Sequence, residues 1–198
     1  MDLVPQLARI ATELAEARRR AHALADPLDD AGWAAWPGRD AWSVAECLMH
    51  LNLTTRAFLP LIASAVASGR ERKLLSRGPY RRDVLGWLLE HIIEPPVPIR
   101  TKTTAPFVPR GIESKVAVLD AFDTLQSHLI AGLGEASGLD LGRLRITSPF
   151  DRRITYNLYS CFRIISAHQR LHLAQAERVI RGAGRRRHGS TASTGEPC

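Results

Sequence analysis

Two histidines four residues apart are the clearest chemical feature of the chain. His168 and His172 belong to the segment SAHQRLHLAQAERV, and this spacing places both imidazoles on one face of a helix, about 5 to 6 Å apart at Cβ. Their ring nitrogens can then reach one metal ion. The same spacing also occurs in ordinary core or surface histidines, so the pair alone leaves both interpretations open.

The residue after the first histidine argues against one familiar metal chemistry. The zinc-protease motif H-E-x-x-H has a glutamate at this position that serves as the general base, whereas this chain has Gln169. Glutamine cannot act as a base at any ordinary pH. A metalloprotease is therefore disfavoured.

A third histidine strengthens the metal interpretation. His50 lies in WSVAECLMHL, at the edge of an apolar stripe that includes Cys47, Leu51 and Phe58, so it can lean toward the core from a second helix. Three neutral imidazoles from two helices leave at least one coordination position open for water or substrate. Such an open position is typical of catalytic metal sites.

These motifs give the chain a family resemblance. The block PGRDAWSVAECLMHL, followed far downstream by SAHQRLHLAQAERV, resembles the DinB-like superfamily, which also includes the bacillithiol and mycothiol S-transferases. The resemblance covers about residues 5 to 180. It implies a metal site formed by His50, His168 and His172, with Gln175 as the glutamine usual three residues after the last histidine.

The resemblance also implies which ligands to expect. Members commonly bind one divalent ion, with zinc or nickel the expected metal, and a low-molecular-weight thiol is a possible co-substrate. Many members have no assigned reaction. Gln169 and Arg170 depart from the family pattern, because members often have a Glu or Asp beside the first histidine of the pair.

Several nearby side chains allow two interpretations each. Glu46 could orient the His50 ring as a hydrogen-bond acceptor, or it could only complete a helix-capping box with Ser43. Cys47 and Cys161 could be soft metal ligands, although small buried thiols are ordinary core residues. Arg56 and Tyr159 could meet an anionic substrate or serve as solvated or packing residues.

The segments that must position these residues are helical. Apolar residues recur at helical spacing over residues 2–25, 43–68, 114–135 and 155–181, with a shorter helix over 81–91. Residues 94–111 contain five prolines and form a crossover. Residues 144–150 are either a β-like stretch or an extended approach to the last helix. The predicted fold class is all-α, an antiparallel four-helix bundle with a long proline-rich crossover between helices 2 and 3.

Composition sets the domain organisation and the partners. Hydrophobic residues make up 45% and charged residues 24% of the 198 residues, as in ordinary globular proteins. We expect one domain over residues 1–183 and a disordered basic tail over 184–198. The net charge is +7, of which the residues from Arg181 onward supply +3, and the remaining basic residues are scattered. Nucleic acid is therefore an improbable partner.

Location and assembly are also predicted from the pattern. The N-terminus is charged throughout, no apolar run is long enough to span a membrane, and the three cysteines form no CxxC pair. We expect a cytoplasmic protein with reduced thiols and no membrane partner. Leu85, Leu88 and Leu89 beside Trp87 could form the contact of a homodimer.

Three functions compete at this point. The first is a metal-dependent enzyme acting on a small molecule, such as a thiol-dependent transferase or isomerase, in which the ion activates a bound thiol or water. A hydrolase would need the same ion. The second is a non-catalytic metal-binding or stress-associated module, which the three histidines would satisfy equally well. The third, a nucleic-acid accessory protein, depends only on the basic surface.

Overall fold

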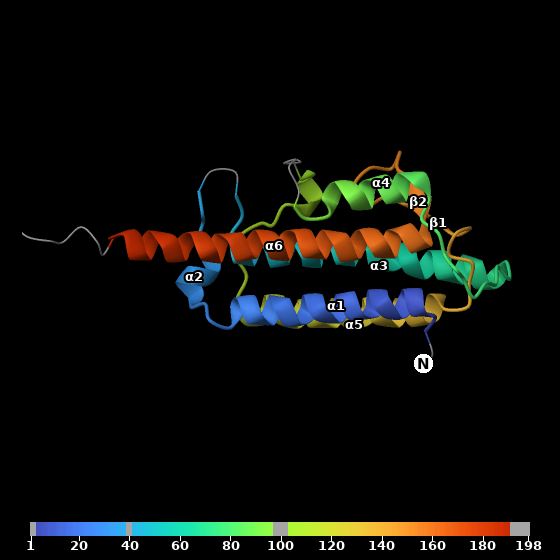
Figure 1. Cartoon of the computed structure of the whole chain (residues 1–198), viewed down its shortest axis with the longest axis horizontal. Coiled ribbons are helices and arrows are strands. Elements are labelled where there is room, and N and C mark those ends of the chain that lie inside the picture. Colours follow the sequence, from blue (N-terminus) through green and yellow to red (C-terminus); the bar gives the residue numbers. More distant parts are fainter. Residues whose placement is uncertain (1–2, 39–40, 97–102, 191–198) are drawn as a thin grey trace, which may run out of the picture.

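The chain is an all-α protein, as the sequence predicts. A computed structural model describes residues 3–38, 41–96 and 103–190, with side chains described as far as residue 182 (Figure 1). The α-helices, one 3-10 helix and two strands are α1 (Pro5–Ala25), α2 (Asp30–Ala34), α3 (Val44–Glu71), α4 (Val84–Ile93), η1 (Ala105–Phe107), α5 (Lys115–Ala136), α6 (Leu158–Ser190), β1 (Arg145–Thr147) and β2 (Thr155–Asn157).

Four long helices form the body of the molecule. Helix α3 packs against α5 and α6, and α1 packs against the same two helices, so that the four lie alongside one another (Figure 1). The shorter α4 packs on α6 from outside this group. No described helix is long and apolar enough to cross a membrane.

The start of α3 follows directly from its sequence. The Ser43 hydroxyl accepts a hydrogen bond from the Glu46 backbone N–H at 3.2 Å, and the Glu46 carboxylate accepts one from the Ser43 backbone N–H at 2.8 Å. This is the predicted capping box, which satisfies two backbone donors that the first helical turn leaves free. It fixes the first turn of α3 one turn before His50.

The core consists of two apolar clusters along the helix axes. One contains Phe58 of α3 and Ile165 of α6, whereas the other contains Leu51 of α3 and Leu173 of α6. On both helices the transition between the clusters falls in the region of the predicted metal-binding histidines. The site therefore lies between two apolar regions that hold its helices in place.

Several helix boundaries differ from the sequence prediction. Helix α6 begins at Leu158 because residues 155–157 form β2, which pairs with β1 in an antiparallel two-stranded sheet. This pairing decides the open question about residues 144–150 in favour of a β-like stretch. Helix α6 continues past Arg181 to Ser190, and α4 begins at Val84 after its Asp83 cap.

Two predicted segments fall partly on residues that the structure does not describe. Residues 97–102 of the proline-rich crossover lie outside the described residues, as do residues 191–198 of the predicted tail. The domain bounds 1–183 and the tail 184–198 remain predictions.

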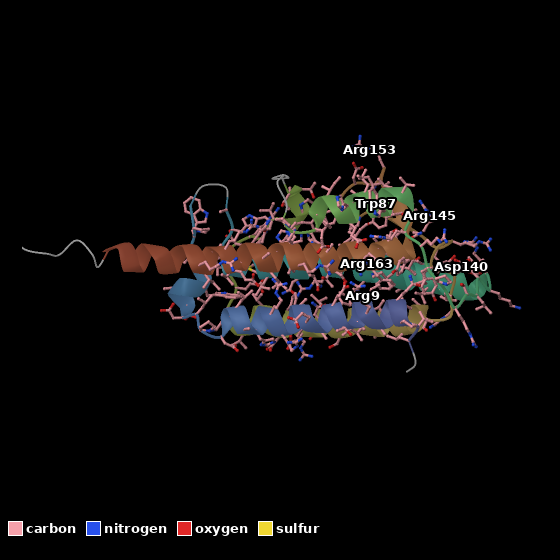
Figure 2. All side chains as sticks on the ribbon, in the orientation of Figure 1. Arg9, Trp87, Asp140, Arg145, Arg153 and Arg163 are labelled. Atoms are coloured by element: carbon pink, nitrogen blue, oxygen red, sulfur yellow. The ribbon has the colours of Figure 1, made fainter. Side chains whose placement is uncertain are left out.

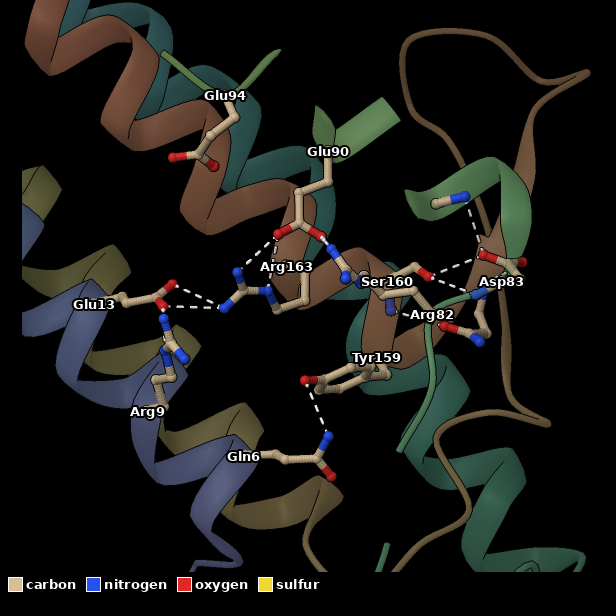
Figure 3. Close-up of polar contacts among 12 residues, drawn as sticks. Gln6, Arg9, Glu13, Arg82, Asp83, Glu90, Glu94, Tyr159, Ser160 and Arg163 are labelled. Atoms are coloured by element: carbon tan, nitrogen blue, oxygen red, sulfur yellow. Dashed lines mark hydrogen bonds and ion pairs between the residues drawn. The ribbon is translucent and has the colours of Figure 1, made fainter. Parts of the chain in front are cut away.

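Charged side chains hold α4 and α1 against α6. The Arg163 guanidinium of α6 lies 3.0 Å from the carboxylate of Glu13 on α1 and 2.8 Å from that of Glu90 on α4 (Figure 3). Arg170, two turns further on, pairs with Glu13 at 2.9 Å and with Glu94, directly after α4, at 2.6 Å. We call these five residues the α6 charge cluster.

The first turn of α4 approaches α6 very closely. The Asp83 carboxylate accepts hydrogen bonds from the Ser160 hydroxyl at 2.9 Å and from the Gly86 backbone N–H at 3.1 Å (Figure 3). A Cβ atom at Gly86 would overlap the Ser160 side chain. Glycine is therefore required at position 86 for the two helices to meet at this distance.

Candidate metal centre

Three imidazoles from two helices converge on one point. The Nε2 atom of His168 lies 3.2 Å from Nε2 of His50 and 3.1 Å from Nε2 of His172. One ligand atom from each ring lies within 4.8 Å of the other two, and this is a group that could hold a metal ion. The structure thus brings together all three histidines singled out from the sequence. We call them the histidine triad.

The hydrogen bond on the far side of His50 fixes which nitrogen faces the triad. The Nδ1 atom of His50 lies 2.7 Å from the backbone carbonyl oxygen of Phe107 in η1. A carbonyl only accepts, so Nδ1 must carry the proton and donate. In a neutral ring, Nε2 of His50 then presents a lone pair toward His168.

The remaining nitrogens leave a surplus of lone pairs at the centre. Nε2 of His168 faces Nε2 atoms of two other rings, but one N–H can donate to only one of them. Lone pairs that converge without enough protons favour a bound cation. In a tetrahedral zinc site with Zn–N bonds of about 2.0 to 2.1 Å, ligand nitrogens lie about 3.3 Å apart, close to the two distances found here.

Burial keeps the triad in the form that binds metal. Burial lowers the pKa of His50, although the hydrogen bond to Phe107 opposes the shift. Burial together with the charge of a protonated His50 lowers the pKa of His168 to about 3. Burial and the two neighbouring rings place the pKa of His172 well below its usual range. At neutral pH all three rings are neutral, the state in which imidazole ligates a metal.

Aromatic rings line the triad. The Trp42 ring stacks on His172 with centroids 5.6 Å apart and an interplanar angle of 20°, and its centroid lies 4.8 Å from that of His50. The Phe150 ring meets the edge of His168 at 5.8 Å and packs on Phe107 at 4.7 Å. These walls limit the access of water.

The triad is not closed on every side. His50 and His172 are buried, whereas His168 is only partly buried. His168 is thus the least buried member of the triad.

The two uncertain neighbours of the triad can now be placed. Glu46 is occupied by the capping box with Ser43, and the acceptor that orients His50 is the Phe107 carbonyl instead. Gln175 opposes the lowering of the His172 pKa, and Nδ1 of His172 has no hydrogen-bond partner within the described part of the chain.

The two cysteines that the structure describes are core residues. Cys47 and Cys161 are free thiols, each at most 1% exposed and each part of an apolar cluster. Burial, with a smaller contribution from Glu46, raises the pKa of Cys47 to about 12, and burial raises the pKa of Cys161 as well. Thiols in this state are poor ligands and poor nucleophiles, because both roles need the thiolate.

Gln169 faces a different helix from its histidine neighbour. Its side-chain amide exchanges two hydrogen bonds with Gln126 of α5, at 2.8 and 3.2 Å, and both residues are 1% exposed. The pair satisfies two buried amides that would otherwise be costly to bury. Position 169 thus connects α6 to α5 and does not face the triad.

Two further candidates lie apart from the triad. Arg56 lines a cavity between α3 and residues 105–113. The Tyr159 hydroxyl accepts a hydrogen bond from Gln6 at 3.3 Å, and its ring packs on Tyr80. Tyr159 is therefore a packing residue.

Fold and site together define an all-α protein in which two helices bring three histidines to one point. A family model of the DinB superfamily matches residues 13–176, a range that contains the whole histidine triad. The chain belongs to the DinB superfamily. No curated protein and no solved structure matched the chain.

Proposed function

We propose that the histidine triad binds one divalent metal ion, zinc or nickel, through its three Nε2 atoms. The observation that carries this proposal is the convergence of these atoms at 3.1 and 3.2 Å around His168. The Phe107 carbonyl supports it, because a second hydrogen bond that holds the ligand ring in one tautomer is a usual feature of metal-bound histidine.

We further propose that the bound ion makes the protein a metal-dependent enzyme, such as a thiol-dependent transferase or isomerase acting on a small molecule. The incomplete burial of His168 supports this function over a non-catalytic metal-binding module, because a substrate would need access to the ion. The ion would lower the pKa of a bound thiol or water. The Trp42 and Phe150 rings would keep bulk water from the centre.

The fold expected for this function is the antiparallel four-helix bundle. The mutual packing of α1, α3, α5 and α6 supports it, since bundles of this kind form metal sites from residues that face inward on neighbouring helices.

Metal content of the purified chain tests the first proposal. Elemental analysis should give about one divalent ion per chain for the wild type, and the His50→Ala, His168→Ala and His172→Ala variants should each lose it. His128→Ala is the matched control, because His128 is an exposed residue of α5. Retention of the ion by all three triad variants would show that the site lies elsewhere.

Fluorescence gives a second measure of the same site. Trp42 stacks on His172, so titration of the metal-free protein with a paramagnetic ion such as Co²⁺ should quench part of the tryptophan emission. The Trp42→Phe variant should lose this quenching and still bind the ion.

A screen of low-molecular-weight thiols with electrophiles then tests catalysis. Absence of turnover across the screen would favour the non-catalytic module.

We also propose that the protein forms a homodimer through α4. The exposed apolar residues of this helix recur along one face and include Trp87, which is 48% exposed (Figure 2); the others are Val84, Leu88 and Ile92. The sequence prediction places Leu85 and Leu89 in this contact as well, but both are half-buried, and Leu89 packs against the core. In sedimentation, the wild type should be a dimer and the Trp87→Lys variant a monomer.

A further inference from the structure

One ring nitrogen of the histidine triad is buried without a partner. His172 is 7% exposed, and its Nε2 lies 3.1 Å from Nε2 of His168. On the other side of the ring, Nδ1 has almost no accessible surface and no hydrogen-bond partner within the described part of the chain. Buried polar atoms are nearly always paired. Because a ligand cannot reach this atom, its partner has to be sought among the neighbouring side chains.

The partner of Nδ1 decides whether His172 can bind an ion. A neutral imidazole carries one proton, either on Nδ1 or on Nε2. With the proton on Nε2, the ring can donate to Nε2 of His168, but it then offers no lone pair at the centre. With the proton on Nδ1, Nε2 is free to ligate, and Nδ1 needs an acceptor. An acceptor beside Nδ1 therefore selects the tautomer that binds metal.

Other polar side chains in the neighbourhood of the triad cannot serve as this acceptor. Trp42 stacks on the face of His172, and the only polar group of its ring is an N–H donor. The Glu46 carboxylate is engaged in the capping box. The amide of Gln169 exchanges its hydrogen bonds with Gln126.

Gln175 has the position and the group that Nδ1 requires. It lies three residues after His172 on α6, a spacing that places two side chains on one helix face, about 5 to 6 Å apart at Cβ. Its side chain is half-buried. Burial and the other two rings of the triad lower the pKa of His172, and Gln175 opposes this shift. A neutral amide has this effect when its oxygen is directed at the N–H of the ring.

We propose that Gln175 is a positioning residue, whose side-chain oxygen accepts a hydrogen bond from Nδ1–H of His172 and so leaves Nε2 free for the ion. This role rests on the metal binding proposed above. The Phe107 carbonyl acts in the same way on His50. Two of the three rings are then held in the ligating tautomer by acceptors from different parts of the chain, η1 and α6.

Nitrogen-15 NMR of the full-length, metal-free protein at neutral pH tests the tautomer directly, because protonated and bare ring nitrogens differ widely in chemical shift. The His172→Ala variant identifies the signals of this ring. The wild type and Gln175→Glu should carry the proton on Nδ1. Gln175→Leu, which keeps the size of the side chain but has no acceptor, should move the proton to Nε2. A purely structural role of Gln175 would not change the tautomer.

Zinc affinity, measured by competition with a chelator, tests the consequence for the ion. Removing the hydrogen-bond partner of a metal-bound histidine lowers metal affinity by about 10- to 100-fold. We expect Gln175→Leu to bind zinc about tenfold more weakly than the wild type, and Gln175→Glu to bind it more tightly, because a carboxylate is the stronger acceptor. Arg178→Leu is the control, because Arg178 is an exposed residue of the same helix. It should leave the tautomer and the affinity nearly unchanged, with the same helicity in all variants.

Two results would overturn the proposal. An unchanged tautomer of His172 in Gln175→Leu would show that another group selects it. Equal zinc affinity of Gln175→Leu and Arg178→Leu would show that Gln175 does not support the ligand. Failure of the metal site is recognised separately, because the wild type would then bind no zinc, whereas the tautomer is measured without metal.

Discussion

Replacement of Glu90 by alanine should destabilise the protein by removing the contact between α4 and α6. Glu90 is 4% exposed. Its carboxylate accepts hydrogen bonds from Arg163 at 2.8 and 3.0 Å and from Arg82 at 2.7 Å. Glu90→Ala leaves the Arg163 guanidinium, itself only 16% exposed, with Glu13 as its one remaining carboxylate in the described ion pairs.

The expected loss can be estimated from these contacts. Removing one partner of a buried ion pair costs roughly 3 to 5 kcal/mol. Because Arg163 keeps its ion pair with Glu13, we expect a value near the lower end, about 3 kcal/mol. In a chain of this size each kcal/mol lowers Tm by about 2 to 4 °C, so Tm should fall by about 6 to 12 °C.

Denaturant unfolding followed by circular dichroism measures this loss. Glu90→Gln keeps the shape and an acceptor oxygen and should lose less than Glu90→Ala. Arg9→Ala is the matched control, because it also breaks an ion pair, 3.3 Å long, but its side chain is 78% exposed (Figure 3). Such surface pairs contribute at most about 1 kcal/mol. If Glu90→Ala lost no more stability than Arg9→Ala, apolar packing alone would hold α4 in place.

Three further perturbations have expected outcomes. Gln169→Glu should destabilise the protein by roughly 2 to 3 kcal/mol at neutral pH, measured by thermal melting, because it buries a carboxylate against Gln126. Burial raises the pKa of Glu13, but Arg163 and Arg170 lower it by more, to a net value below 4.5. The contribution of Glu13 to the free energy of unfolding is therefore present above pH 4.5 and lost as pH falls through the lowered pKa. In acid unfolding curves, Glu13→Gln should reduce this loss. The pKa values of the histidine triad lie below 6.5 in the folded chain, so the stabilisation by bound metal should be present above that pH and decline as pH falls through the lowered values, with ion release in dialysis and unchanged helicity as the check.

The parts of the site that the sequence predicts are those with a local signal. His168 and His172 follow from their spacing on one helix, and the capping box sets where the helix of His50 begins. Amphipathic periodicity predicts the long helices, because each must bury an apolar face along its length. The predicted ends of these helices are less accurate, because β2 takes the residues expected to begin the last helix.

The parts that the sequence does not predict depend on backbone groups and distant partners. The acceptor for His50 is the Phe107 carbonyl, 57 residues away in sequence, and every residue has a carbonyl, so no residue type marks this one. Glu46 was a reasonable alternative because its carboxylate is one helical turn from His50. The capping box uses that carboxylate, and the proline-rich segment supplies the acceptor instead.

The sequence does not predict the α6 charge cluster, for a related reason. Arg163 and Arg170 lie seven residues apart on one face of α6, and their partners come from α1 and from α4 with the residue after it. A basic pair at this spacing is equally typical of a solvated helix face. Only the packing of three helices brings the carboxylates to it.

The geometry of helix α6 explains why the departure from the family pattern does not affect the proposed metal site. Successive residues of a helix point about 100° apart, so Gln169 cannot share a face with His168 and is directed to Gln126 of α5. The arginines of the α6 charge cluster lie on a third face of this helix, opposite the histidine triad. A carboxylate at position 169 would therefore meet α5, not the histidine triad. Its absence here removes no base from the proposed centre, and any base for the proposed reaction would have to come from the substrate, the solvent or the groups around His168.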